Sequence, residues 1–237
     1  MPEGLTTRLF MCYTDSGDDM DIFKYKGFIF DLDGTLIDSG YVWSEVDKRF
    51  LSKRGFDVPD DYCKSVSAMN FMQAARYTKA RFCLKDSLDD IIKEWHAQAF
   101  AEYRDNVAAI PCARDMLSKL KTMGKKIALA TASDASLYEP ALKRNKMYEY
   151  IDFFAQTSQV SRGKGFPDVY QLAAQGIGCA PCDCIVFEDI AEGISGAKMG
   201  GFAACAVLSG QVNGISELKK LADLAITDFG ELLMPKE

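Results

Sequence analysis

The chain has 237 residues, of which 48% are hydrophobic and 26% are charged, so it can bury a sizeable core and is not expected to be disordered. Its formal net charge of −6 argues against a nucleic-acid partner, for which a basic surface is expected. No stretch approaches the roughly 20 apolar residues of a membrane span, and the N-terminus does not resemble a signal peptide, so we expect a cytoplasmic protein without a membrane partner.

The first strand is expected immediately after a loosely ordered N-terminal tail. Residues 1–23 show little periodicity and several turn formers, and Met20 is an alternative start. The run Phe28-Ile29-Phe30 is typical of a fully buried strand, and it is followed by Asp31 and Asp33. These acids form either an ordinary surface turn or a catalytic pair at the carboxyl end of a sheet strand.

Residues 39–108 are predicted to be almost wholly helical, as an insertion between strands. Val42 and Val46 lie on one face of a first helix that ends near Gly55. A second helix is expected to start at residues 59–60 and to carry Val66, Met69 and Ala74. A third starts at Ser87, which forms a capping box with Asp90.

Strands and helices alternate after Pro111, which predicts a doubly wound parallel sheet. Residues 24–38 and 109–237 would then form one α/β core, with residues 39–108 as a separate helical domain. The predicted strands are 126–134, 152–158, 184–189, 202–208 and 224–227, and the predicted helices are 113–124, 136–144, 166–176, 190–201 and 215–222.

Polar residues follow four of the predicted strands, and the carboxyl ends of parallel strands share one edge of a sheet. These residues are Asp31 and Asp33, Thr131 and Ser133, residues 158–164 with Lys164, and Glu188 with Asp189. Carboxylates gathered this closely repel one another unless a cation lies among them, and oxygen ligands favour Mg²⁺. One carboxylate could attack phosphorus, a second could transfer protons, and a hydroxyl and an ammonium could hold phosphoryl oxygens.

Other kinds of site find little support. The chain has a single histidine, His96, on a predicted helix, which excludes a zinc site built on several histidines and leaves a serine–histidine triad only this residue. Cys179, Cys182 and Cys184 lack a fourth ligand with suitable spacing, so we interpret them as loop and strand residues rather than a zinc site.

Four segments, in order, resemble the motifs of the haloacid dehalogenase superfamily. They are DLDGTL (31–36), Thr131 in ALATASD, Lys164 in RGKGFPDVY, and FEDIAEGISGAKMGG (187–201). The resemblance spans about residues 24–237 and is nearest to the β-phosphoglucomutase-like phosphatases. It implies a Rossmann-like core, and the helical insertion after the first motif resembles the C1-type cap of that superfamily.

The resemblance also implies a role for each motif residue. Asp31 would be the nucleophile and a Mg²⁺ ligand, and Asp33 the general acid and base, with its backbone carbonyl on the metal. Thr131 and Lys164 would hold the phosphoryl group. Asp189 would bind Mg²⁺, with Glu188 beside it, directly or through water.

Two departures from the superfamily pattern bear on function. The third motif reads GKGFPD where GKPxPD is common, which leaves the lysine in an altered loop. Trp43 occupies the position at which β-phosphoglucomutases carry a histidine, which favours hydrolysis over mutase chemistry. Trp43 either faces the substrate or packs between cap and core.

The resulting prediction is a Mg²⁺-dependent phosphatase that acts on a small phosphorylated metabolite, preferably a sugar phosphate, through an aspartyl-phosphate. The alternatives are a phosphosugar mutase and a non-catalytic binding module of the same fold; a receiver-like signalling domain fits the long helical insertion poorly. We expect a monomer or weak dimer. Four cap arginines are candidates for a distal substrate group: Arg49, Arg54, Arg76 and Arg81.

Overall fold

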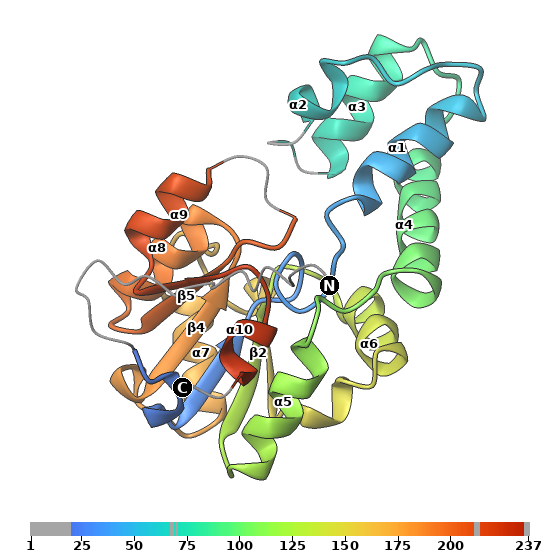
Figure 1. Ribbon diagram of the computed structural model, residues 1–237. Helices are drawn as coiled ribbons and strands as arrows, with labels where there is room; N and C mark the ends of the chain where they lie inside the picture. Colours follow the sequence, from blue (N-terminus) through green and yellow to red (C-terminus); the bar gives the residue numbers. More distant parts are fainter. Residues whose placement is uncertain (1–19, 67–68, 70, 211–213, 235–237) are drawn as a thin grey trace, which may run out of the picture.

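A six-stranded parallel sheet forms the centre of the molecule (Figure 1). The computed structural model describes residues 20–66, 69, 71–210 and 214–234. The strand order is β3-β2-β1-β4-β5-β6, which confirms the predicted doubly wound sheet. The strands are β1 (Gly27–Phe30), β2 (Lys126–Thr131), β3 (Phe153–Gln156), β4 (Cys184–Glu188), β5 (Ala203–Val207) and β6 (Leu224–Ile226).

Helices cover both faces of the sheet, because successive side chains of a buried strand point to opposite faces. Phe28 and Phe30 of β1 belong to one apolar layer, which includes residues of α5 and α6. Ile29 belongs to the other layer, with residues of α7, α8 and α9. The core helices are α5 (Ala113–Thr122), α6 (Ala135–Arg144), α7 (Asp168–Gly176), α8 (Ala191–Met199), α9 (Ile215–Leu221) and α10 (Gly230–Leu233).

Four of the five described helices between β1 and β2 form a second lobe, which we call the cap (Figure 1). They are α1 (Val42–Ser52), α2 (Tyr62–Val66), α3 (Phe71–Arg81) and α4 (Leu88–Asp105). The chain segments that enter and leave the cap are paired, since Ile37 forms an antiparallel bridge with Ala109. Ser87 caps α4 as predicted, by accepting a hydrogen bond from the Asp90 N–H at 3.1 Å.

One predicted cap helix is two helices in the structure. Val66 ends α2, whereas Ala74 lies in α3. The Met69 N–H donates to the Val66 carbonyl at 2.9 Å, which closes a three-residue turn rather than continuing the four-residue spacing of an α-helix. The spacing of Val66, Met69 and Ala74 therefore resembled one apolar helix face, although the hydrogen-bond pattern changes at Met69.

The described chain begins inside the segment that we predicted to be a tail. Asp21 caps the short helix η1 (Ile22–Lys24), and the buried Ile22 joins the core. The remainder of that prediction, residues 1–19, lies outside the described residues. Among the helices that are described, none combines the length and the hydropathy that crossing a bilayer requires.

Candidate active site

Three neighbouring strands deliver polar side chains to one edge of the sheet. Asp31 follows β1 and is 3% exposed, and its backbone N–H donates to the Phe187 carbonyl of β4 at 2.9 Å. Thr131 ends β2 and Glu188 ends β4, and both are fully buried. The strands beside β1 therefore place a hydroxyl and a second carboxylate on either side of Asp31.

Lys164 lies between two of these carboxylates. Its Nζ contacts Asp31 Oδ1 and lies 2.7 Å from Glu188 Oε1, which also accepts a hydrogen bond from the Tyr170 hydroxyl at 2.8 Å. Burial lowers the pKa of Lys164, but Asp31 and Glu188 together outweigh that effect and raise the pKa above its ordinary value. The ammonium group therefore stays charged at neutral pH.

Gly196 of α8 explains how the loop that carries Lys164 reaches the site. A Cβ at Gly196 would lie 2.0 Å from the Lys164 carbonyl oxygen, so no other residue permits this approach of helix and loop. A glycine inside α8 is thus required for packing, although glycine lowers helix propensity.

Asp31, Glu188 and Asp189 form a compact acidic cluster, with one carboxylate oxygen from each lying within 4.8 Å of the others. Burial, followed by the neighbouring carboxylates, raises the pKa of Asp31 well above its ordinary value despite Lys164. Burial and then Glu188 raise the pKa of Asp189 to about 7. Gly34, at φ +80°, makes room for this cluster, because a Cβ there would lie 2.2 Å from Asp189 Oδ2.

The donor set of this cluster fits a hard divalent cation. Its ligands are carboxylate oxygens alone, the chemistry that Mg²⁺ prefers. Glu188 Oε2 is buried and has no hydrogen-bond partner among the described residues, although a buried carboxylate oxygen normally has one. The cluster could therefore hold a metal ion.

Asp33 lies two residues after Asp31, and three hydroxyl groups hold its carboxylate. Ser39 donates to Oδ1 at 2.6 Å, Tyr103 to the same oxygen at 2.5 Å, and Ser133 to Oδ2 at 2.6 Å. The sequence placed Ser133 at this edge but missed Ser39 and Tyr103. Ser39 follows the first motif closely, whereas Tyr103 is 70 residues away and left no signal.

Two further residues singled out in the sequence are Thr131, expected to hold the phosphoryl group, and Trp43, for which the sequence left two roles open. The Thr131 hydroxyl accepts a hydrogen bond from the Ser133 N–H at 2.9 Å, which shapes the loop after β2. Trp43 is 38% exposed, and its ring meets that of Phe71 edge-on at 5.3 Å between centroids. Trp43 therefore packs against another cap residue, and part of its side chain remains exposed to solvent.

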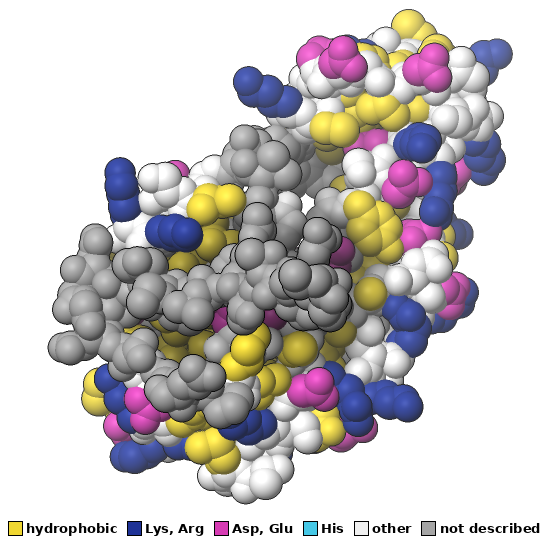
Figure 2. All heavy atoms as spheres, in the orientation of Figure 1, with side chains coloured by type: hydrophobic (Ala, Val, Ile, Leu, Met, Phe, Trp, Pro, Cys, Tyr) yellow, Lys and Arg dark blue, Asp and Glu magenta, His cyan; other side chains and the backbone are white. Residues whose placement is uncertain are grey.

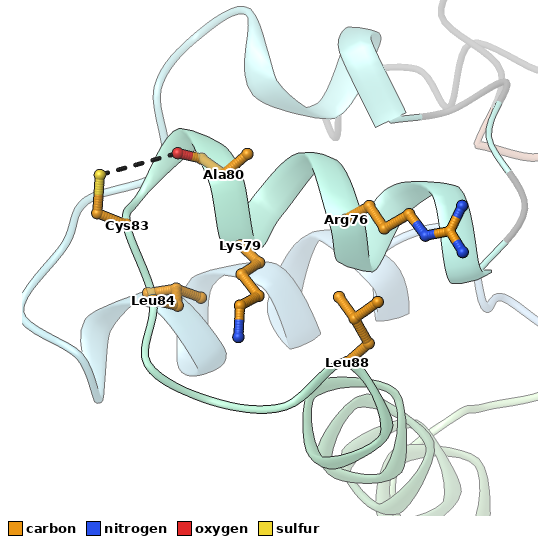
Figure 3. Close-up of a pocket in the computed structure, with 6 residues that line it drawn as sticks. All are labelled: Arg76, Lys79, Ala80, Cys83, Leu84 and Leu88. Atoms are coloured by element: carbon orange, nitrogen blue, oxygen red, sulfur yellow. Dashed lines mark hydrogen bonds between the residues drawn. The ribbon is translucent and has the colours of Figure 1, made fainter.

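Three of the four candidate cap arginines are paired with carboxylates of the cap itself. The pairs are Arg49 with Glu102, Arg54 with Asp86 and Glu94, and Arg81 with Asp61. Arg76 lines a hollow of about 730 Å³ beside Lys79, Cys83, Leu84 and Leu88 (Figure 3). That hollow contains none of the motif residues. In the described part of the chain, the acidic cluster is the one group of three possible metal ligands.

Curated proteins similar to this chain include several phosphatases. The phosphorylated carbohydrates phosphatase of Thermotoga maritima is 26% identical over 198 residues, which cover 84% of this chain and 90% of that protein. The validoxylamine A 7′-phosphate phosphatase of Streptomyces hygroscopicus subsp. limoneus is 29% identical, with 89% and 97% covered. Hexitol phosphatase A of Escherichia coli K12 is 28% identical, with 90% and 96% covered.

Solved structures share the architecture. A candidate β-phosphoglucomutase from Thermotoga maritima superimposes with a TM-score of 0.78 at 25% identity, over 88% of this chain and 96% of the other. The sequence profile of the haloacid dehalogenase-like hydrolases matches residues 28–207, most of the chain and all four predicted motifs. The chain therefore belongs to the haloacid dehalogenase-like hydrolase family.

Proposed function

We propose that this protein is a Mg²⁺-dependent phosphatase that hydrolyses a small phosphorylated metabolite, with sugar phosphates favoured, through an aspartyl-phosphate. The observation that carries the proposal is the position of Asp31, which is buried at the end of a central strand, contacts Lys164 and forms an acidic cluster with Glu188 and Asp189. The names of two similar proteins, a phosphorylated carbohydrates phosphatase and a hexitol phosphatase, support the substrate class.

In the first step, an Asp31 carboxylate oxygen attacks phosphorus and displaces the alcohol of the ester. Asp33 donates a proton to the leaving oxygen as the P–O bond breaks. Thr131 and the Lys164 ammonium hold phosphoryl oxygens, so that charge in the transition state meets fixed donors. The products are a free alcohol and phosphorylated Asp31.

In the second step, water hydrolyses the acyl phosphate. Asp33, now deprotonated, takes a proton from the attacking water, and the Asp31 carboxylate departs as the leaving group. Inorganic phosphate is released and both aspartates regain their starting states. The same pair of side chains thus serves both half-reactions.

Asp31, Glu188 and Asp189, with the Asp33 carbonyl, would hold the Mg²⁺ ion. The bound cation would offset the negative charge that Asp31 and the phosphoryl group bring together. Lys164 contacts Asp31 and Glu188 and brings one positive charge to a cluster of three carboxylates, so a bound cation would balance the remaining negative charge.

The test is phosphate release from sugar phosphates, nucleotides and an aryl phosphate. We expect release that requires Mg²⁺, stops with a chelator, and falls about 10³-fold or more in Asp31→Asn. Asp223→Asn, which alters an acid of the opposite sheet edge, should keep the wild-type rate. A folded protein that releases no phosphate from any ester would overturn the proposal, and an isomerised sugar phosphate without free phosphate would identify the mutase.

A further inference from the structure

Two cysteine side chains lie side by side at the amino edge of the sheet, and we call them the thiol pair: Cys179 and Cys184. Cys184 begins β4 and is buried, whereas Cys179 lies in the loop after α7 and is half-buried. A Cβ at Gly27 would lie 2.5 Å from Cys184 Sγ and 3.3 Å from Cys179 Cβ, so both side chains occupy the space above this glycine. Cysteines this close can form a disulfide without a large movement of the backbone.

The local backbone holds the thiol pair in this arrangement. Gly178, at φ +68°, follows α7 and turns the chain so that the Cys179 N–H donates to the Ala174 carbonyl at 3.0 Å. β1 and β4 pair in a register that sets Gly27 opposite Cys184. Cys184 belongs to the apolar layer of α7, α8 and α9, and Cys179 packs against that layer. One thiol is therefore positioned by a helix end and the other by the sheet.

The thiol pair lies away from the candidate active site. The starts of parallel strands share the edge opposite to the motif residues, and in Figure 1 that edge is the end of the core farthest from the cap. Charged side chains of both signs are visible along this end of the core in Figure 2. Since Cys179 is half-buried at this hydrophilic margin, a small polar oxidant can reach its sulfur from water.

The two thiols differ in the chemistry that each can perform. Burial, followed by the neighbouring Cys179, raises the pKa of the Cys184 thiol to about 12, so this sulfur keeps its proton at neutral pH. The Lys26 ammonium pairs with Asp183 at 3.0 Å, and the hydrogen bond to Asp183, with a smaller effect of the nearby Cys179 and Cys182, raises the pKa of Lys26. A fixed positive charge attracts a thiolate. Cys179 is therefore suited to attack an oxidant, and Cys184 to react afterwards.

We propose that Cys179 and Cys184 form a redox modification site, at which a hydroperoxide drives formation of a reversible disulfide. The Cys179 thiolate attacks the terminal oxygen of the hydroperoxide and the O–O bond breaks. The leaving alkoxide or hydroxide takes a proton from water, and Cys179 becomes a sulfenic acid. The Cys184 sulfur then attacks the Cys179 sulfur, the S–O bond breaks, and the departing hydroxide takes the Cys184 proton to form water. The thiols are oxidised by two electrons, which the hydroperoxide accepts.

Peptide mapping of the folded, full-length chain after oxidation identifies the bond directly. Cleavage before aspartate residues separates fragment 168–182, which holds Cys179 and Cys182, from fragment 183–188, which holds Cys184. After treatment with hydrogen peroxide and blocking of free thiols with iodoacetamide, we expect the two fragments to be joined, with Cys182 alkylated. Dithiothreitol should separate them again. A disulfide within fragment 168–182, or no disulfide at all, would overturn the inference.

Matched variants separate the thiol pair from other cysteines of the chain. Cys179→Ser and Cys184→Ala should each abolish the link between the two fragments. Cys182→Ser alters an exposed thiol of the same loop, and Cys205→Ala alters a buried thiol of β5, and both variants should retain the link. Loss of the link in Cys182→Ser would show that the oxidant reacts first at Cys182, and would contradict the assignment of Cys179.

Trapping of the sulfenic acid tests the order of the two steps. In Cys184→Ala the oxidised Cys179 has no thiol to react with, so dimedone should label Cys179 strongly in this variant and weakly in wild type. In Cys179→Ser the buried Cys184 should stay unlabelled. Label on Cys184 in Cys179→Ser, or none on Cys179 in Cys184→Ala, would overturn the two roles. Neither measurement depends on phosphate release, so a failure of the proposed phosphatase function would leave both results unchanged.

Discussion

Three hydroxyl groups hold the carboxylate of Asp33, and each comes from a different part of the chain. Ser39 belongs to the segment that enters the cap, Tyr103 to the last turn of helix α4, and Ser133 to the loop after β2. Tyr103 is 2% exposed, so its hydroxyl has little access to water as an alternative partner. We infer that Tyr103 is a positioning residue, which aims Asp33 at the leaving oxygen.

Tyr103→Phe tests that role through the leaving group. The variant keeps the buried ring and removes the donor, so Asp33 loses one of its restraints. We expect kcat/KM to fall about tenfold for an alkyl phosphate, whose alcohol must be protonated, and less than about twofold for p-nitrophenyl phosphate, whose phenolate leaves unaided. Tyr62→Phe is the matched control, because Tyr62 is also buried and shares a 2.7 Å hydrogen bond with Thr78. An equal decrease for both esters would assign Tyr103 a structural role only.

The central strands of the core were predictable because they are continuous buried runs. β1 and β4 are buried at every residue, and turn-forming residues separate them from the helices. The cap was harder, because helix period alone does not say where one helix ends. Val66 and Ala74 matched a single apolar face, yet the turn at Met69 places them in different helices.

The partly buried carboxyl of Asp47 in α1 destabilises the folded state when it is ionised, and the hydrophobic pattern of the sequence does not indicate this. Burial raises the pKa of this carboxyl to about 6, against about 3.9 in an unfolded chain. The folded state therefore binds more protons between these values, and stability falls as pH rises from about 4 to about 6. Above that range the ionised group destabilises the cap.

Asp47→Asn should relieve that cost. We expect the variant to raise the free energy of unfolding by about 1–2 kcal/mol at pH 8, allowing for the partial exposure of Asp47, and to have little effect at pH 4. Urea midpoints at the two pH values measure the difference. Asp57→Asn, at an exposed cap position, should have a free energy of unfolding within about 0.5 kcal/mol of wild type at both pH values. A stabilisation of equal size at pH 4 would show that charge is not its cause.

The site as a whole joins segments that are far apart in sequence. Asp31, Thr131, Lys164 and Glu188 were predictable together because three follow or end parallel strands and the fourth lies in a recognisable motif. Tyr103 was not predictable as a site residue. The sequence pattern of a helix does not indicate which of its side chains contacts another lobe of the molecule. The fold therefore brings one set of residues together by topology and another by the docking of the cap.

Metal linkage should be visible in the stability of the entire chain. At about 100 times its Kd, an ion that binds only the folded state adds about 2.7 kcal/mol, so we expect Mg²⁺ to raise Tm by about 5 °C or more. Asp189→Asn removes one of three crowded carboxylates, two of which are buried. It should unfold at an equal or higher Tm than wild type without metal, and lose most of the Mg²⁺ response. Asp115→Asn, at an exposed position, should respond like wild type. If a cation relieves the repulsion within this cluster, Asp189→Asn must weaken the response to Mg²⁺. An undiminished response in that variant would place the metal elsewhere.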